Sequence, residues 1–130
     1  MVVAAVRNPQ KDQALFSLDE RKAMIEESTR HLDNVQVTMF SSLVVDLARE
    51  VGADFIVKGI RNVADYEVEK QMARMNHKIS GIDTLFIPCL SGNSFLASRL
   101  IREIHRYGGD VSSMVPAPVA KRLVDKRDEA

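Results

Sequence analysis

The sequence predicts an α/β fold built on a parallel sheet, and three observations support this class. Short apolar runs of strand length alternate with longer segments of helical periodicity. The apolar runs are mostly continuous, which is typical of parallel strands covered on both faces. Several helical segments end at a glycine, the usual residue just past a helix. Alternating strands and helices favour parallel strands joined by right-handed crossovers.

Length and composition bound the class of protein. The chain has 130 residues, 45% hydrophobic and 28% charged, which predicts one globular domain over residues 1–130. Lys and Arg together number 18, as do Asp and Glu, so the net charge is zero. This balance favours neither nucleic acid nor a membrane surface as a partner. Cys89 is the single cysteine, which excludes an internal disulfide and fits a cytoplasmic protein.

The first elements are expected between residues 2 and 40. Residues 2–6 form an apolar run that predicts a strand. Ser17 and Glu20 have the spacing of a capping box, which predicts a helix over residues 18–31. Residues 35–40 are β-branched and partly alternating, so they predict the next strand.

The middle of the chain continues the alternation. Ser41 or Ser42 is expected to cap a helix that ends at Gly52. Residues 55–57 predict the next strand. The apolar positions of that capped helix are expected to face inward, namely Val44, Leu47, Ala48 and Val51.

Three further helices and a strand complete the prediction. A helix over residues 66–79 is expected to end at Gly81 and to precede a strand over residues 84–87. Residues 97–106 predict a helix ended by Gly108 and Gly109, and a last helix follows Pro116 and Pro118. Inward-facing positions of these helices are Val68, Met72, Met75, Ile79, Leu100, Ile101, Ile104, Val119, Leu123 and Val124.

Residues 57–76 carry most of the functional information. We interpret Gly59 as a turn residue with a cation on each side, Lys58 and Arg61, at the end of a buried strand. Backbone amides can approach a phosphate at such a glycine, and the cations supply charge. The start of the following helix also favours anions. This combination indicates a nucleotide or phosphate site.

Two other segments are expected at the same edge of the sheet, beyond the carboxyl ends of the strands, where parallel sheets bind ligands. The loop with Lys11 follows the first strand, and residues 91–94 follow the fourth. Ser94 and Ser98 bracket the start of a helix whose first amides can meet an anion, and Arg99 and Arg102 lie in its first turns.

Purely structural interpretations stand beside each of these. Lys11 can be a solvated surface charge, and Gly59 can be a simple turn residue. Lys58 and Arg61 can pair with Asp65 or Glu69 in a structural ion network. The methionines of the 66–79 helix favour a core role. The three histidines are scattered and form no cluster with metal-ligand spacing.

The residues from Lys58 to Asn76 closely resemble bacterial phosphopantetheine adenylyltransferase, and the resemblance continues in order over the chain. It includes residues 8–11, 16–21, 43–46, 94–98 and 108–111. The resemblance implies a Rossmann-like nucleotidyltransferase sheet. It also implies transfer of the adenylyl group of ATP to 4′-phosphopantetheine, which yields dephospho-CoA and pyrophosphate, with Mg²⁺ bound through ATP. A cytoplasmic homohexamer is implied, and CoA is a further expected ligand.

The resemblance also implies residue roles. Lys11 and Lys58 would hold the substrate phosphate, Leu43 and Val44 would line the pantetheine arm, and Arg61 with Lys11 would supply catalytic charge. ATP would be bound by Gly59, Ile60, Arg61, Glu69, Asn93, Ser94, Phe95, Leu96, Ala97, Ser98, Arg99 and Arg102. Ala97 departs from the family, which usually has serine there.

The sequence departs from the family most at its beginning. The family's first strand and its Gly-His loop, roughly 30 residues by the size of such a unit, have no counterpart here. We expect an N-terminally truncated enzyme with impaired turnover, because losing an equivalent transition-state donor costs about 10²–10³ in rate. We also expect the strands at 2–6 and 55–57 either to pair directly or to leave the chain unstable.

Two alternatives to the enzyme remain. A non-catalytic nucleotide- or CoA-binding remnant of the same fold would bind without turnover. A scaffold domain would carry these lysines and arginines only as surface charges.

Overall fold

The computed structural model describes residues 1–6 and 14–129, which divide into two compact units. Unit 1 comprises residues 1–41 and 96–130, and unit 2 comprises residues 42–95. Unit 1 contains β1 (Val2–Val6), α1 (Leu18–Ser28), β2 (Gln36–Phe40), α4 (Ser98–Arg106) and α5 (Ala117–Asp128). Unit 2 contains α2 (Val44–Glu50), β3 (Phe55–Ile60), α3 (Val63–Ser80), β4 (Asp83–Pro88) and a 3₁₀ turn over Ser91–Asn93.

Each unit holds a two-stranded parallel sheet whose strands are joined through a helix. β1 pairs with β2 in a register that aligns Val2 with Gln36, and β3 pairs with β4 in a register that aligns Phe55 with Asp83. These ladders confirm the predicted parallel α/β class. Of the two outcomes that we expected for the 2–6 and 55–57 strands, direct pairing does not occur in the ladders of the described residues, and instability of the chain stays a prediction.

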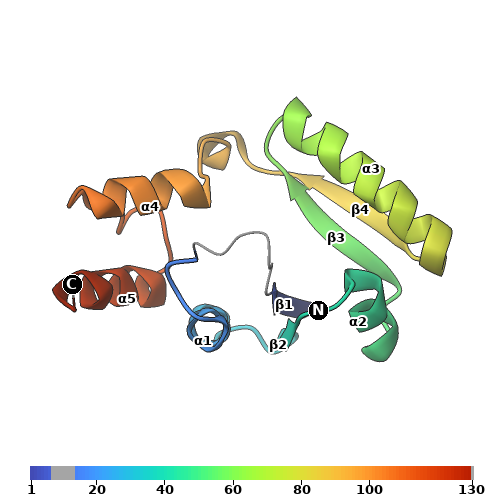
Figure 1. The fold of residues 1–130 in the computed structure, drawn as a ribbon, viewed down its shortest axis with the longest axis horizontal. Coiled ribbons are helices and arrows are strands. Elements are labelled where there is room, and N and C mark those ends of the chain that lie inside the picture. Colours follow the sequence, from blue (N-terminus) through green and yellow to red (C-terminus); the bar gives the residue numbers. More distant parts are fainter. Residues whose placement is uncertain (7–13, 130) are drawn as a thin grey trace. The chain divides into compact units, whose positions relative to one another are not determined.

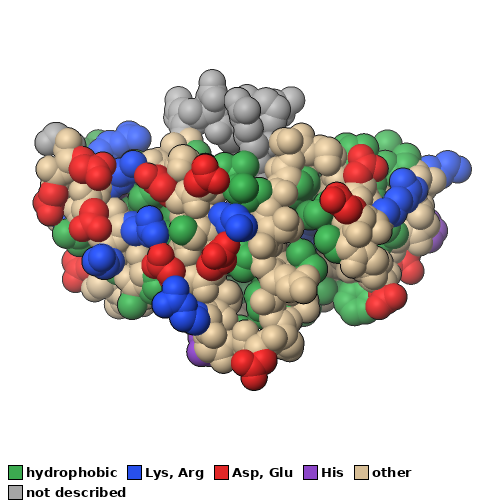
Figure 2. Space-filling model, turned by 90° about the horizontal axis from the view of Figure 1, so that it is seen from below, with side chains coloured by type: hydrophobic (Ala, Val, Ile, Leu, Met, Phe, Trp, Pro, Cys, Tyr) green, Lys and Arg blue, Asp and Glu red, His purple; other side chains and the backbone are tan. Residues whose placement is uncertain are grey.

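The core of unit 1 lies where α1, β2 and α5 meet. Met24 of α1 and Leu123 of α5 are buried, at 6% and 3% exposure. Two ion pairs join the same helices, from Arg122 to Glu27 at 2.7 Å and from Lys126 to Glu20 at 3.3 Å. In the left half of Figure 2, acidic and basic side chains are interspersed, in keeping with such pairs.

The capping box of α1 forms as predicted. The backbone N–H of Glu20 donates to the Ser17 hydroxyl at 3.1 Å, and the Glu20 carboxylate accepts from the Ser17 N–H at 3.0 Å. The helix ends at Ser28, three residues before the predicted end, where the Thr29 hydroxyl donates to the Ile25 carbonyl at 2.7 Å. The end of α1 is therefore closed by a side chain that competes for the helix carbonyls.

In unit 2, α3 lies along β3 and β4 (Figure 1), and an edge-to-face contact of Tyr66 with Phe86 at 5.6 Å anchors it. The apolar residues on the other side of the sheet are exposed, between 45% and 55%, namely Phe55, Val57, Leu85 and Ile87. Helix α2 is joined to the end of α3 by a hydrogen bond of 3.0 Å from the Arg49 guanidinium to the Ile79 carbonyl.

Several predicted inward faces are wrong. The α3 stripe of Val68, Met72, Met75 and Ile79 is at least half exposed, because the polar flank that carries Glu69 and Ala73 turns toward the sheet instead. Leu100, Val124 and Val51 are also exposed. In α2 the buried residues are Val45, Leu47 and Ala48, and Val44 is half-buried.

The predicted cap of α2 is also wrong. The N-cap residue is Leu43, without a side-chain hydrogen bond, and neither Ser41 nor Ser42 takes that position. The glycines that end helices behave as expected, since Gly52, Gly81 and Gly108 have φ values of 69°, 75° and 83°.

Candidate functional site

The segment with Lys58 and Gly59 belongs to strand β3, and the glycine turn that we predicted does not form. The ladder with β4 continues through Lys58 opposite Phe86 and Gly59 opposite Ile87 and ends at Ile60. Gly59 does not have a positive φ, and a side chain added there would meet nothing within 4 Å. The pairing with β4 therefore keeps this glycine extended, and its position on an open strand face leaves its backbone accessible.

Lys58 forms an ion pair with Glu69, on the flank of α3. Its Nζ lies 3.6 Å from the Glu69 carboxylate, which joins the strand to the helix that covers it. Alternation along β3 puts Lys58 on the half-buried side with Ile56 and Ile60. The cation is consequently held at the sheet–helix boundary.

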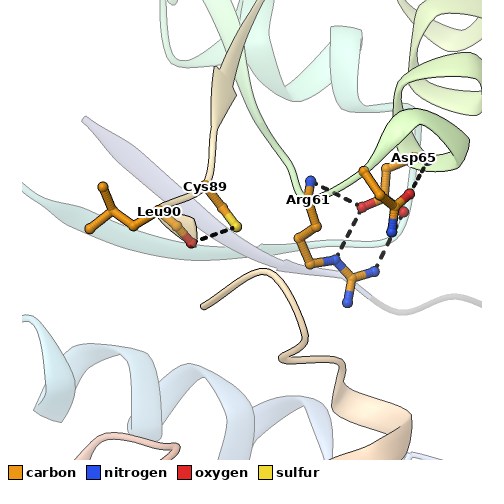
Figure 3. A network of polar contacts seen from close by, with 5 residues as sticks. Arg61, Asp65, Cys89 and Leu90 are labelled. Atoms are coloured by element: carbon orange, nitrogen blue, oxygen red, sulfur yellow. Dashed lines mark hydrogen bonds and ion pairs between the residues drawn. The ribbon is translucent and has the colours of Figure 1, made fainter. Parts of the chain in front are cut away.

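Arg61 lies one residue beyond β3 and faces the first turn of α3 (Figure 3). Its Nε donates to the Asp65 carboxylate at 3.1 Å, and its backbone N–H donates to the same oxygen at 3.2 Å. The hydrogen bond from the guanidinium, helped by that from the backbone, holds the pKa of Asp65 below its usual range. The carboxylate is thus a charged partner of Arg61 at neutral pH.

The first turn of α3 is capped and carries a negative charge from within the helix. The Asn62 side chain accepts from the Asp65 N–H at 2.9 Å as the N-cap, and Asp65 lies in the first turn. Both Arg61 and Lys58 have carboxylate partners, which confirms the ion pairing considered above. Such exposed pairs contribute roughly 0–1 kcal/mol, so a phosphate that accepts two hydrogen bonds from Arg61 can compete with them.

The remaining ATP and substrate positions lie in both units. In unit 2, Leu43 is exposed at the start of α2, Val44 is half-buried, and Asn93, Ser94 and Phe95 are exposed. In unit 1, Leu96 and Ala97 are half-buried, and Ser98, Arg99 and Arg102 lie on α4. Lys11 falls outside the described residues. The site roles of all these residues stay predictions.

The start of α4 differs from that of α3. Ala97 is the N-cap residue and offers no side-chain acceptor, and the first turn holds no acid. Ser98 and Arg99 are exposed there. A helix start without a side-chain cap leaves its first amides available to an anion.

Other side chains add little chemistry to this region. Cys89 is a free thiol whose Sγ donates to the Leu90 carbonyl at 3.4 Å (Figure 3). Among the described residues, no three His, Cys, Asp or Glu side chains are placed to share a metal ion. No described helix is both long and apolar enough to cross a membrane. His105, in the last turn of α4, is buried.

Comparison with known proteins gives the class first. A family model described as cytidylyltransferase-like matches residues 1–104. Together with parallel βαβ units and cations at the end of β3, this match defines a protein of the cytidylyltransferase-like nucleotidyltransferase class, which confirms the predicted fold.

A phosphopantetheine adenylyltransferase of Corynebacterium diphtheriae is 44% identical over 126 residues, which cover 97% of this chain and 79% of the relative. The chain therefore belongs to the phosphopantetheine adenylyltransferase family. This membership confirms the resemblance that residues 58–76 indicated.

Proposed function

We propose that the chain transfers the adenylyl group of ATP to 4′-phosphopantetheine, giving dephospho-CoA and pyrophosphate. The observation that carries this proposal is the 44% identity over nearly the whole chain to a relative of that name. A phosphate oxygen of the substrate forms a bond to the α-phosphorus of ATP, and the bond from that phosphorus to the bridging oxygen breaks. The pyrophosphate leaves with the electron pair, so no protein nucleophile is needed.

Cations of unit 2 would neutralise the phosphate charges of this reaction. Arg61 would exchange its Asp65 partner for a nucleotide phosphate, and Lys58 would neutralise the attacking phosphate beside Glu69. Gly59 and Ile60 would offer backbone contacts to ATP, and Leu43 and Val44 an apolar wall to the pantetheine arm. Lys11 would add a second cation to the substrate phosphate.

Residues of the 93–102 segment would bind the triphosphate and adenine. The start of α4 at Ser98, which has no side-chain cap, supports a contact with phosphate oxygens. Arg99 and Arg102 would add charge. Mg²⁺ would be held mainly by the phosphates of ATP, and it would neutralise the charge of the triphosphate.

The test uses matched pairs of variants. Arg61→Ala and Lys58→Ala are compared with Arg74→Ala and Lys78→Ala, which remove exposed cations of α3. We expect kcat/KM for dephospho-CoA formation to fall by about tenfold to a hundredfold in each variant of the first pair, because a charge-assisted contact contributes about 1.5–3 kcal/mol. The control pair should stay within twofold of the parent chain. Equal activity of all four variants would refute the assignment of these cations.

A second candidate is binding without turnover. It is favoured by the pairing of both cations with carboxylates. Calorimetric titration with ATP and with CoA separates the two candidates. Saturable binding with no pyrophosphate release over long incubations would support the binding module and contradict the enzyme.

We also propose a cytoplasmic homohexamer, as the family resemblance implies. Light scattering coupled to size exclusion should give six times the mass of the 14.5 kDa chain. A monomeric peak at working concentrations would contradict this.

A further inference from the structure

His105 is an ionisable residue that the proposed adenylyl transfer does not use. It lies in the last turn of α4 and is 9% exposed, and among the buried side chains that the structure describes it is the polar one. It lies outside the positions that we assign to ATP and to the substrate. Its contacts within unit 1 therefore indicate what it does.

Arg127 of α5 joins the two helices through the ring and the backbone of His105. Its Nη2 lies 3.2 Å from Nδ1 of His105, 3.3 Å from the His105 carbonyl oxygen and 3.2 Å from the Gly109 carbonyl oxygen. The last carbonyls of a helix lack partners within the helix and carry partial negative charge, so a guanidinium there is favourable. One cation of α5 thus holds the end of α4.

The chemistry of Arg127 fixes the protonation state of the His105 ring. A guanidinium has only donors, so Nδ1 of His105 must accept this hydrogen bond and carry no proton. The neutral ring then carries its proton on Nε2, and Nδ1 is the atom that a second proton would occupy. Protonation would turn the acceptor into a donor and would put two cations in contact.

The ring is placed to exchange protons with solvent while the chain stays folded. His105 lines a hollow of about 620 Å³ that α4 and α5 border. Besides Arg127, the ionisable side chains that line this hollow are Arg99, Arg102, Glu103, Arg106, Tyr107 and Lys126.

The charges around the ring oppose its protonation. Arg102 precedes His105 by three residues and lies on the same side of α4, whereas Glu103 precedes it by two, a spacing at which helix side chains do not face each other. In the turn after α4, the Asp110 carboxylate accepts from the Ser112 N–H at 2.9 Å. A proton on the ring would therefore act mainly against Arg127.

The contact of α5 with α1 should outlast the contact of α5 with α4 as the pH falls. Burial, and then the charge of Arg127, hold the pKa of His105 below its usual 6.5. Hydrogen bonds hold the pKa values of Glu20 and Glu27, the α1 partners of α5, below their usual 4.5. We expect the ring to take up its proton at a higher pH than these two carboxylates.

We propose that His105 and Arg127 form an acid-sensitive latch between α4 and α5. A proton on Nδ1 expels the guanidinium, and the end of α4 separates from α5 while α5 stays on α1. Helix α4 also carries Arg99 and Arg102, so acid would reach the triphosphate site through this helix. Only that last step rests on the proposed function, since the latch is measured in the free protein.

Hydrogen exchange of the whole chain, resolved by residue with NMR, tests the latch. The reporters are the N–H groups of Tyr107, Gly108 and Gly109, which donate to carbonyls of α4, and the Thr29 N–H at the end of α1 is the reference. Between a pH well above 6.5 and about pH 5, we expect the reporter protection factors to fall about tenfold or more, as the loss of a charge-assisted hydrogen bond predicts. The Thr29 protection factor should change less than twofold.

His105→Gln should remove this pH response, because a glutamine can accept from Arg127 and does not titrate. The exposed His31→Gln is the matched control and should keep the response. A fall of the same size in His105→Gln would overturn the latch. Equal falls at the reporters and at Thr29 would mean general weakening of the fold and would overturn it as well.

Arg127→Gln tests the other half of the latch without changing the histidine. Its reporters should be weakly protected at both pH values, because the cation that holds the end of α4 is gone. Arg122→Gln, which removes another arginine of α5 paired with Glu27, should keep the pH response of the parent chain. Strong protection at both pH values in Arg127→Gln, or a response like that of the parent chain, would contradict the proposal.

Discussion

At Gly109 the packing leaves no room for a side chain. A Cβ built there would lie 2.5 Å from Cγ2 of Ile104 and 3.1 Å from the Ile104 carbonyl oxygen. We predict that Gly109→Ala lowers the free energy of unfolding by about 1–3 kcal/mol, the usual cost of forcing atoms into a packed site. Chemical denaturation of the purified variant measures it.

Gly59→Ala is the matched control at the same scale. No atom lies within 4 Å of the position that a Cβ would take at residue 59, and the backbone there is extended in β3. We predict unchanged or slightly higher stability, because alanine loses less chain entropy in a strand than glycine. A large loss of stability would contradict the strand assignment. Weaker ATP binding in a variant that remains stable would mean that Gly59 contacts the ligand.

At the scale of the helix, burial separates two residues that the sequence treats alike. Leu123 of α5 is 3% exposed, and Met75 of α3 is 62% exposed, although periodicity predicts both inward. We predict that Leu123→Ala costs about 2–4 kcal/mol of unfolding free energy and that Met75→Ala costs less than about 0.5 kcal/mol.

Denaturant midpoints of the two variants test this directly. Similar losses for both would mean that the apolar stripe of α3 is covered in solution and that periodicity, rather than the described packing, assigns its face. Unchanged slopes of the transitions are required for the comparison, because a changed slope reports a change in the unfolded or folded ensemble.

For the whole molecule, acid should weaken the fold in two steps. Burial, helped by the charge of Arg127, holds the pKa of His105 below its usual 6.5. The unfolded chain then binds more protons, so this contribution is complete above about pH 6.5 and is lost as pH falls through the lowered pKa.

The second step belongs to carboxylates. The Ser17 backbone hydrogen bond lowers the pKa of Glu20, and the Arg122 hydrogen bond lowers that of Glu27, each from a usual 4.5. Their contributions are present above that pH and are lost below it, and Asp65 and Asp110 act in the same direction.

We predict that the melting temperature of the parent chain falls as the pH drops below about 6.5 and falls again below about pH 4.5. His105→Gln should flatten the first fall and leave the second. The exposed His31→Gln serves as a control and should leave both. A first fall of the same size in the parent chain and in His105→Gln would refute the role of His105.

Local chemistry was readable from the sequence. The capping box of α1 and the helix-ending glycines follow from contacts within a few residues, and the strands from short apolar runs, so the local pattern alone predicted where these elements lie. The resemblance of residues 58–76 likewise indicated the family, because that motif is continuous in the chain. The partners of Lys58 and Arg61 were also foreseen, since Glu69 and Asp65 follow them closely along the chain.

Only the tertiary structure decided which faces are buried and which distant residues meet. Periodicity marks an apolar stripe on α3, but the ladder of β3 with β4 and the Tyr66–Phe86 contact turn its polar flank to the sheet. The hold of Arg127 on the end of α4 joins residues 22 apart, and the arginine-lined hollow needs α4 and α5 side by side. The physical reason is that local pattern sets the dihedral preferences of a segment, while burial and long-range charge depend on which surfaces pack together.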